Sequence, residues 1–278
     1  MGRADDSMNV KIHGCRGSIP VSQNSASKYG GNTSCMVLET SGQILILDAG
    51  NGLIQVNEWI KKAQVDKTLN ILLSHLHLDH LIGLPVFSHV WDSDNCVRIY
   101  TCDRDKRPLK EQIFGMFVPP YWPASMVHSA NAECIAIKAN VAFEIGPITI
   151  TPFSAAHPDD TVSFHINDGD KTVVHLLDSE ISMLNKQQYD TLVSYCRNAD
   201  LVIFDAAYSP ADYPAKKGWG HSTIEDGFRL AKDSGCKKMI FSHFSFEYGD
   251  QELEALEALA KAQGDKFTFA SDGMELCL

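Results

Sequence analysis

The chain has 278 residues, of which 44% are hydrophobic, and its formal net charge is −11 at pH 7. This length and hydrophobic content are enough for one large domain, and the acidic balance disfavours long nucleic acid, because proteins that grip a phosphate backbone present many lysines and arginines. The segment 1–9 lacks the apolar core of a signal peptide, and no run of about 18 apolar residues follows, so we expect a cytoplasmic protein with no membrane partner.

The first third of the chain is predicted to be rich in β-strands. Short runs of apolar and β-branched residues alternate there with glycine-containing turns. The run 69–73 is too apolar for a half-exposed strand, so we expect it in the middle of a sheet that is covered on both faces. The predicted strands are 10–13, 35–40, 44–48, 69–73 and 98–102.

The segment 104–130 interrupts this pattern with prolines and aromatic residues. We expect it to form either a lid over a functional site or a contact between subunits, and in the second case the protein would be a homodimer. As a lid, it would bring aromatic rings that can stack on a bound base. The aromatic residues concerned are Phe114, Phe117, Tyr121 and Trp122.

The second half of the chain alternates strands and helices, and each apolar run there is followed by turn or helix signals. No linker, low-complexity tract or short repeat divides the chain. We therefore predict a single α/β domain over residues 1–278, made of two similar halves. The predicted strands are 148–153, 161–166, 172–177, 201–204, 238–241 and 267–270, and the predicted helices are 186–197, 223–233 and 251–262.

The chemically informative motif follows the apolar strand at 69–73 and runs His75-Leu76-His77-Leu78-Asp79-His80. Three imidazoles and one carboxylate lie within six residues of sequence. Zinc prefers these ligand types, and alternating residues at a strand end can serve one metal while the next turn serves another. The alternative is a polar loop with chance histidines, but the interleaved leucines favour a metal site.

Further ligands are expected where other apolar runs end. His157, Asp178 and His243 each follow such a run. Because the carboxyl ends of strands can meet at one edge of a sheet, these side chains can lie close together. For the remaining histidines we expect structural roles, since a lone histidine is more often a satisfied structural group than a ligand. These are His13, His89, His128, His165 and His175.

Through residues 75–80 the chain resembles the metallo-β-lactamase superfamily, whose signature is His-x-His-x-Asp-His. The resemblance extends over nearly the whole chain, because Asp48, His157, Asp178 and His243 match the other conserved acids and histidines of that family. It implies a four-layer αββα sandwich, in which two mixed β-sheets are flanked by helices. Asp48 is expected to support the ligands from behind, and the alternative is that it only forms a turn at a strand end.

The resemblance also implies two divalent metal ions. One would be held by His75, His77 and His157, and the other by Asp79, His80 and His243, with Asp178 bridging the two. Such a pair shares a hydroxide that attacks the substrate. Zinc is the expected metal, and manganese or iron are alternatives, because histidine and aspartate ligands accept all three.

A second motif, Gly220-His221-Ser222-Thr223, precedes a predicted helix. Ser222 and Glu225 fit a Ser-x-x-Glu capping box, which would place His221 at a helix N-terminus that favours a phosphoryl oxygen. The run resembles the phosphodiesterase branch of the superfamily, which includes RNase Z and the cyclic-phosphate and cyclic-nucleotide phosphodiesterases. By that resemblance Asp205 orients His221. The alternative is that His221 is a surface residue at a helix start.

The catalytic candidates are therefore His221, Asp205 and Asp79, and Asp79 is also a metal ligand. We expect a phosphodiesterase that acts on a small cyclic nucleotide or cyclic phosphate. RNase Z itself is disfavoured, because only 20 residues (158–177) separate His157 from Asp178. They are expected to form two strands joined by a turn at 167–170, which leaves no room for a transfer-RNA-binding arm.

Two alternatives to this prediction remain. The first is a thioester or lactone hydrolase that uses the same metal pair, in which His221 would be incidental. The second is a non-catalytic sensor that binds a metal or a nucleotide. A sensor would be expected to have lost some of its ligands, and the ligand set of this chain is complete.

Overall fold

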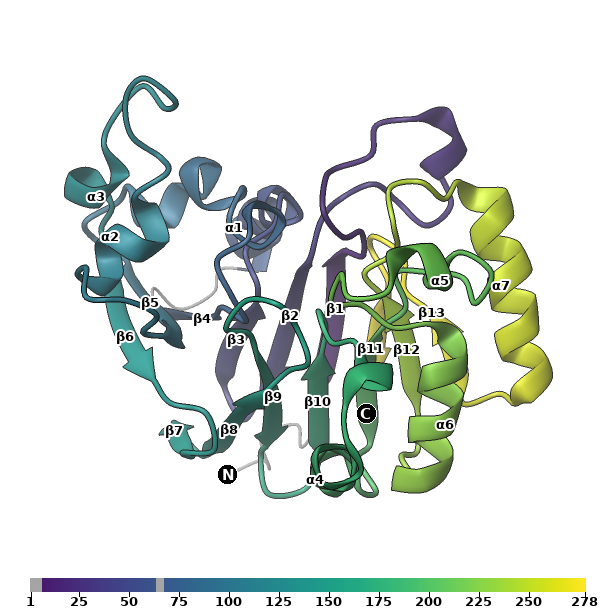
Figure 1. Ribbon diagram of the computed structural model, residues 1–278. Helices are drawn as coiled ribbons and strands as arrows, with labels where there is room; N and C mark the ends of the chain where they lie inside the picture. Colours follow the sequence, from purple (N-terminus) through teal and green to yellow (C-terminus); the bar gives the residue numbers. More distant parts are fainter. Residues whose placement is uncertain (1–6, 64–67) are drawn as a thin grey trace.

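Two seven-stranded β-sheets form the centre of the fold, and helices cover their outer faces (Figure 1). The computed structural model describes residues 7–63 and 68–278. The prediction that no signal peptide precedes the domain rests mainly on residues 1–6, which lie outside the described residues. The four-layer αββα sandwich of two mixed sheets is confirmed.

The first sheet has the order β14-β1-β2-β3-β4-β5-β6. Pairing is antiparallel from β14 to β3 and parallel from β3 to β6, so the sheet is mixed. Its strands are β1 (Asn9–Gly14), β2 (Cys35–Thr40), β3 (Gln43–Leu47), β4 (Thr68–Leu72), β5 (Cys96–Cys102), β6 (Glu133–Ile137) and β14 (Glu275–Cys277).

The second sheet has the order β13-β12-β11-β10-β9-β8-β7. It is antiparallel from β7 to β10 and parallel from β10 to β13. Strands β9 and β10 form the expected hairpin. The strands are β7 (Phe143–Ile145), β8 (Ile148–Ser154), β9 (Val162–Asn167), β10 (Thr172–Leu176), β11 (Leu201–Asp205), β12 (Met239–Ser242) and β13 (Phe267–Phe269).

The strands of the first sheet bury both of their faces, because side chains alternate along a strand. Leu38 and Leu45 belong to a core that also contains residues of the second sheet, whereas their neighbours Val37 and Ile46 belong to a second core. That second core includes Leu53 of helix α1. This two-sided burial explains why the strand predicted at 69–73 is almost entirely apolar.

The three helices predicted at 186–197, 223–233 and 251–262 are confirmed. They are α4, α6 and α7, and each end lies within one or two residues of the prediction. The prediction lacked α1, β6, β7 and β14. The apolar residues of α1 do recur at helical spacing, with Leu53, Val56 and Ile60 buried on one face. The helices are α1 (Leu53–Ala63), α2 (Leu109–Phe114), α3 (Met126–Ser129), α4 (Lys186–Cys196), α5 (Tyr213–Lys216), α6 (Ile224–Ser234) and α7 (Asp250–Gln263).

The segment 104–130 forms α2, α3 and their connections at one end of the first sheet (Figure 1). Phe114 and Phe117 are buried in the second core, and Trp122 packs against it. Phe114 and Phe117 are therefore not available to stack on a bound base, and the lid or subunit contact at 104–130 stays a prediction. Tyr121 is 83% exposed and Trp122 is partly buried, so these two rings remain accessible.

No helix in the described part of the chain has the length and apolar character needed to span a membrane.

Candidate metal centre

Several strand ends deliver acids and histidines to one edge of the two sheets. Asp48 directly follows β3, His243 directly follows β12, and Asp178 lies two residues beyond β10. All three have a positive backbone φ, at 59°, 63° and 49° respectively. Left-handed backbone is uncommon for residues other than glycine, although aspartate, asparagine and histidine tolerate it best. Such strain concentrates at functional sites, where it aims side chains that an extended strand would direct elsewhere.

The motif at 75–80 leaves β4 and ends in a single 3-10 turn, Leu78–His80. His75 and His80 are almost completely buried, and Asp79 is buried as well. The side chain of His77 remains 45% exposed, and its Nε2 atom lies 2.7 Å from Oδ2 of Asp159. Asp159 was not among the sequence candidates. It places an additional carboxylate beside the first group of histidines.

The structure brings together all seven predicted ligands. One ligand atom each of His75, His77 and His157 lie within 4.8 Å of one another. The same spacing holds for a second group, made of Asp79, His80 and His243. These two groups correspond to the two ligand sets that the resemblance implies.

Asp178 lies between the two groups. Its Oδ1 atom is 3.8 Å from Nε2 of His75 and 4.0 Å from Nε2 of His157. Its Oδ2 atom is 3.2 Å from Nε2 of both His80 and His243. The two oxygens of one carboxylate therefore face different histidine groups, which is the arrangement that a bridging ligand requires.

The donor set fits a divalent cation. Within the described residues, Nε2 of His75 is buried and has no hydrogen-bond partner, and burial lowers the pKa of this imidazole well below its usual value. Nε2 of His80 faces Nε2 of His243 at 3.4 Å. Buried polar atoms that lack a partner are costly, and neutral imidazoles converging on carboxylates are the ligands that zinc and related ions take. These residues are suited to hold divalent metal.

Asp48 is fully buried and supports the group of Asp79, His80 and His243 from behind. Its Oδ1 atom accepts hydrogen bonds from the backbone N–H of Ser74 at 2.8 Å and from the Ser74 hydroxyl at 2.9 Å. Its Oδ2 atom lies 2.9 Å from Nδ1 of His80, which directs Nε2 of that ring toward Asp178. Carboxylates that orient a ligating imidazole in this way are common behind metal sites.

Burial disfavours the charged form of His80, but the carboxylates of Asp79, Asp178 and Asp48 outweigh that effect and raise its pKa well above the usual value. His175, which we expected to be structural, also lies behind the centre. Its Nε2 atom is 3.8 Å from Oδ2 of Asp48.

His221 lies at the edge of the metal centre, and the helix cap beside it differs from the prediction. The N-cap of α6 is Thr223, which forms a capping box with Asp226. The predicted box of Ser222 and Glu225 is wrong, because the Ser222 hydroxyl donates instead to the carbonyl oxygen of Ser179 at 2.6 Å. His221 therefore precedes the cap by two residues rather than adjoining the first helical turn.

The imidazole of His221 is paired with Asp205, as the resemblance suggested. The distance from Nδ1 to Oδ2 of Asp205 is 2.9 Å, and Asp205 is also held by the backbone N–H groups of Ser179 and Ala207. The ring stacks on His243 with centroids 5.0 Å apart. Burial alone would lower the pKa of His221, but the charge of Asp205 and the hydrogen bond to it raise the pKa to about 9. The pairing with Asp205 therefore favours the protonated form of the imidazole.

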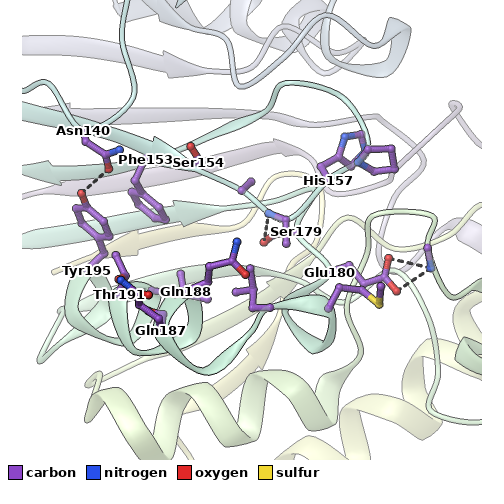
Figure 2. A pocket seen from close by; sticks show the side chains of 17 residues that line it. Asn140, Phe153, Ser154, His157, Ser179, Glu180, Gln187, Gln188, Thr191 and Tyr195 are labelled. Carbon is purple, nitrogen blue, oxygen red and sulfur yellow. Dashed lines mark hydrogen bonds between the residues drawn. The ribbon is translucent and has the colours of Figure 1, made fainter.

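Glu180 holds the loop that carries His221, and this residue was not predicted from the sequence. The carboxylate is buried and accepts a hydrogen bond from the backbone N–H of Gly218 at 2.8 Å (Figure 2). It also accepts from the backbone N–H of Gly220 at 2.9 Å and from the Tyr213 hydroxyl at 2.7 Å. Gly220 has a φ of +93°, and a Cβ atom there would lie 2.3 Å from the ring of His157. Only glycine allows the loop to pack so closely on this histidine.

Comparisons with known proteins agree with this geometry. The model of the beta-lactamase superfamily domain matches residues 43–244, which is more than half of the chain. Ribonuclease Z of Haloarcula marismortui is 21% identical in an alignment of 315 positions that covers 96% of each chain.

Two solved structures resemble the fold over its whole length. The metallo-beta-lactamase fold protein YhfI from Bacillus subtilis has a TM-score of 0.76 and 23% identity, and the match covers 99% of this chain and 100% of YhfI. A diphosphatase from the PhnP family has a TM-score of 0.70 and 16% identity, with 97% of each chain covered. The chain therefore belongs to the beta-lactamase superfamily and has the metallo-β-lactamase fold.

Proposed function

We propose that this protein is a metal-dependent hydrolase, specifically a phosphodiesterase that acts on a small cyclic nucleotide or cyclic phosphate. The observation that carries the proposal is the buried pair of His221 and Asp205 at the edge of the metal centre. The names ribonuclease Z and diphosphatase among its relatives both denote hydrolysis at phosphorus, which supports the same class of reaction.

Two divalent ions bound at this centre would supply a water molecule of lowered pKa and positive charge beside the phosphate. His75, His77 and His157 would hold one ion, Asp79, His80 and His243 the other, and Asp178 would bridge them.

His221 supplies a second source of positive charge. Asp205 engages Nδ1 of His221, which leaves Nε2 as the nitrogen that can donate to a phosphoryl oxygen or to the departing oxygen. A buried cation at this position favours an anionic, phosphorane-like transition state and can protonate the leaving group. A phosphodiester is already an anion before attack, whereas a thioester or lactone is uncharged at that stage, so the pair favours the phosphodiesterase over that alternative.

A small substrate is favoured over transfer RNA. The segment between His157 and Asp178 forms the β9–β10 hairpin and carries no arm. The net charge of −11 also works against a polyanionic partner. The names of the ribonuclease Z relatives make precursor transfer RNA the necessary comparison substrate.

The proposal is tested by replacing His221 with Ala and measuring hydrolysis of bis-p-nitrophenyl phosphate together with metal content. We expect turnover to fall by about 10²- to 10⁴-fold, because that is the usual contribution of a positioned acid, while metal content stays unchanged. The matched control is His128→Ala, a replacement of an exposed histidine on α3.

Unaltered phosphodiester cleavage in the His221→Ala variant would show that the assigned role is wrong. Parallel assays with a thioester, a lactone and precursor transfer RNA separate the remaining candidates. Rapid cleavage of the thioester or lactone with no cleavage of any phosphodiester would select the alternative hydrolase.

A further inference from the structure

A groove of about 520 Å³ lies between β8 and helix α4 and opens beside the metal centre (Figure 2). His157 and Ser179 form the wall at one end. His157 is a candidate metal ligand, and Ser179 directly follows Asp178. Asn140 and Tyr195 form the wall at the opposite end. The groove thus leads away from the place where a phosphate would meet the metal ions, and its volume is typical of small-molecule sites.

Two stacked rings, Phe153 of β8 and Tyr195 of α4, form the end of the groove that lies away from the metal centre. The ring of Tyr195 lies parallel to that of Phe153, with centroids 4.3 Å apart. The Tyr195 hydroxyl donates a hydrogen bond to Oδ1 of Asn140 at 2.9 Å, which fixes the orientation of the tyrosine ring. Ordered aromatic surface of this kind suits a flat, apolar group.

The turns of α4 that precede Tyr195 offer polar, uncharged side chains to the groove. Gln187, Gln188 and Thr191 line the groove there. Gln188 uses Oε1 to accept a hydrogen bond from the backbone N–H of Asn185 at 3.0 Å, which leaves its amide nitrogen as a donor. Side-chain amides can both donate and accept, so they suit a ligand that carries both kinds of group.

The groove contains no site for an anion. No lysine or arginine is among the described residues that line it. Its one carboxylate, Glu180, is already engaged by three hydrogen-bond donors. A phosphate or carboxylate would therefore bind at the metal end, and the groove itself is left for a neutral group.

We propose that this groove binds the base of a nucleotide whose phosphate lies at the metal centre. The inference rests on the proposed phosphodiesterase function and specifies its substrate as a nucleoside phosphate rather than a simple sugar or alkyl phosphate. A base provides a flat ring to pack against the aromatic end of the groove, and donors and acceptors for the amides of α4. An alkyl chain would match the aromatic end and leave the amides of α4 without partners.

The test compares the binding of adenosine 5′-monophosphate and ribose 5-phosphate to the zinc-loaded protein by calorimetry. The two ligands share the sugar and the phosphate and differ in the base. We expect the nucleotide to bind at least about tenfold more tightly, because stacking and polar contacts to one base typically have that effect. Octyl phosphate, which offers an apolar chain in place of the base, is expected to bind no better than ribose 5-phosphate.

Two variants locate the effect in the groove. Thr191→Trp fills it from α4 and should abolish the preference for the nucleotide without changing the affinity for ribose 5-phosphate. Gln187→Ala removes one amide without adding bulk and should reduce the preference severalfold. Ser194→Trp is the matched control, because Ser194 is exposed on the same helix but does not line the groove.

An equal affinity of the wild-type protein for both sugar phosphates would overturn the proposal. An unchanged preference in a folded Thr191→Trp variant, or tighter binding of octyl phosphate than of the nucleotide, would also overturn it. These outcomes are independent of catalysis. If the protein binds the nucleotide as expected but cleaves no phosphodiester, the proposed function fails and the base site stands. If it cleaves bis-p-nitrophenyl phosphate without any preference for the nucleotide, the function stands and the base site fails.

Discussion

Oδ2 of Asp48 lies 2.9 Å from Nδ1 of His80, and both side chains are completely buried. Asp48 therefore fixes the ring of a candidate ligand from the side opposite to Asp178. Its other oxygen is held by Ser74, so the carboxylate cannot rotate away without losing two further hydrogen bonds.

Replacing Asp48 with Asn should weaken metal binding by about 10- to 100-fold, since loss of a carboxylate behind a ligating histidine usually has that effect. Competition with a chromogenic chelator measures this directly. Asp92→Asn, at an exposed position away from the site, serves as the control. Unchanged metal affinity in the Asp48 variant would contradict the orienting role.

Replacing Glu180 with Gln should lower kcat while leaving metal content unchanged. The neutral side chain keeps its size but accepts weaker hydrogen bonds from the N–H groups of Gly218 and Gly220, so the loop that carries His221 loses its fixed position. The pH profile distinguishes this effect from a merely structural one, because a displaced His221 also changes the pH at which activity falls. A lower melting temperature with an unaltered pH profile and kcat would refute the assignment.

The activity should fall as the pH rises through about 9, because the pKa of His221 is raised to that value and the protonated imidazole is the required form. In Asp205→Asn, burial remains while the charge that opposes it is lost, so the fall should move to lower pH. A profile of kcat/KM between pH 6 and 10 for both proteins is the measurement.

The raised pKa of His221 also affects the stability of the fold. Protonated His221 stabilises the fold fully below about pH 6.5, and that contribution is lost as the pH rises through about 9.

Replacing Gly220 with Ala should disturb the first group of histidines, because the added Cβ would lie 2.3 Å from the ring of His157. Gly218→Ala is a close control. It has a similar positive φ of +88°, but open space surrounds the position where the Cβ would lie. Both variants should lose about 1 kcal/mol or somewhat more of unfolding free energy from backbone strain. Only Gly220→Ala should also lose metal, as measured by elemental analysis of the purified protein.

The fold could be predicted in large part from the sequence because its signals are local. The apolar run at 69–73 and the helix 251–262 each show the pattern of one kind of element, and both are found. Helix α1 was missed although Asn51 and Gly52, both residue types favoured at a helix N-cap, precede it and its apolar residues recur at helical spacing. The short strands β7 and β14 have three residues each, too few for an alternating pattern to be recognised.

Some residues of the candidate site could also be predicted from the sequence, and others could not. The spacing from His75 to His80 is visible in the sequence, and the strand-end positions of His157, Asp178 and His243 could be inferred from the apolar runs before them. Glu180 and Asp159 could not be inferred, because their partners are backbone N–H groups or a residue 82 positions away in sequence. The cap at Thr223 was misplaced because Ser222 and Thr223 both fit a capping box, and only the contact between Ser222 and Ser179 decides between them.

The left-handed backbone at Asp48, Asp178 and His243 makes the stability of the folded chain depend on bound metal. Each of these conformations lowers the free energy of unfolding by about 1 kcal/mol or more, and the cluster they create places several ionisable groups in a buried space. A bound cation offsets both penalties in the native state but has no comparable site in the unfolded chain. Depletion of metal should therefore do more than stop turnover: it should shorten the survival of the protein against proteolysis in a metal-poor cell.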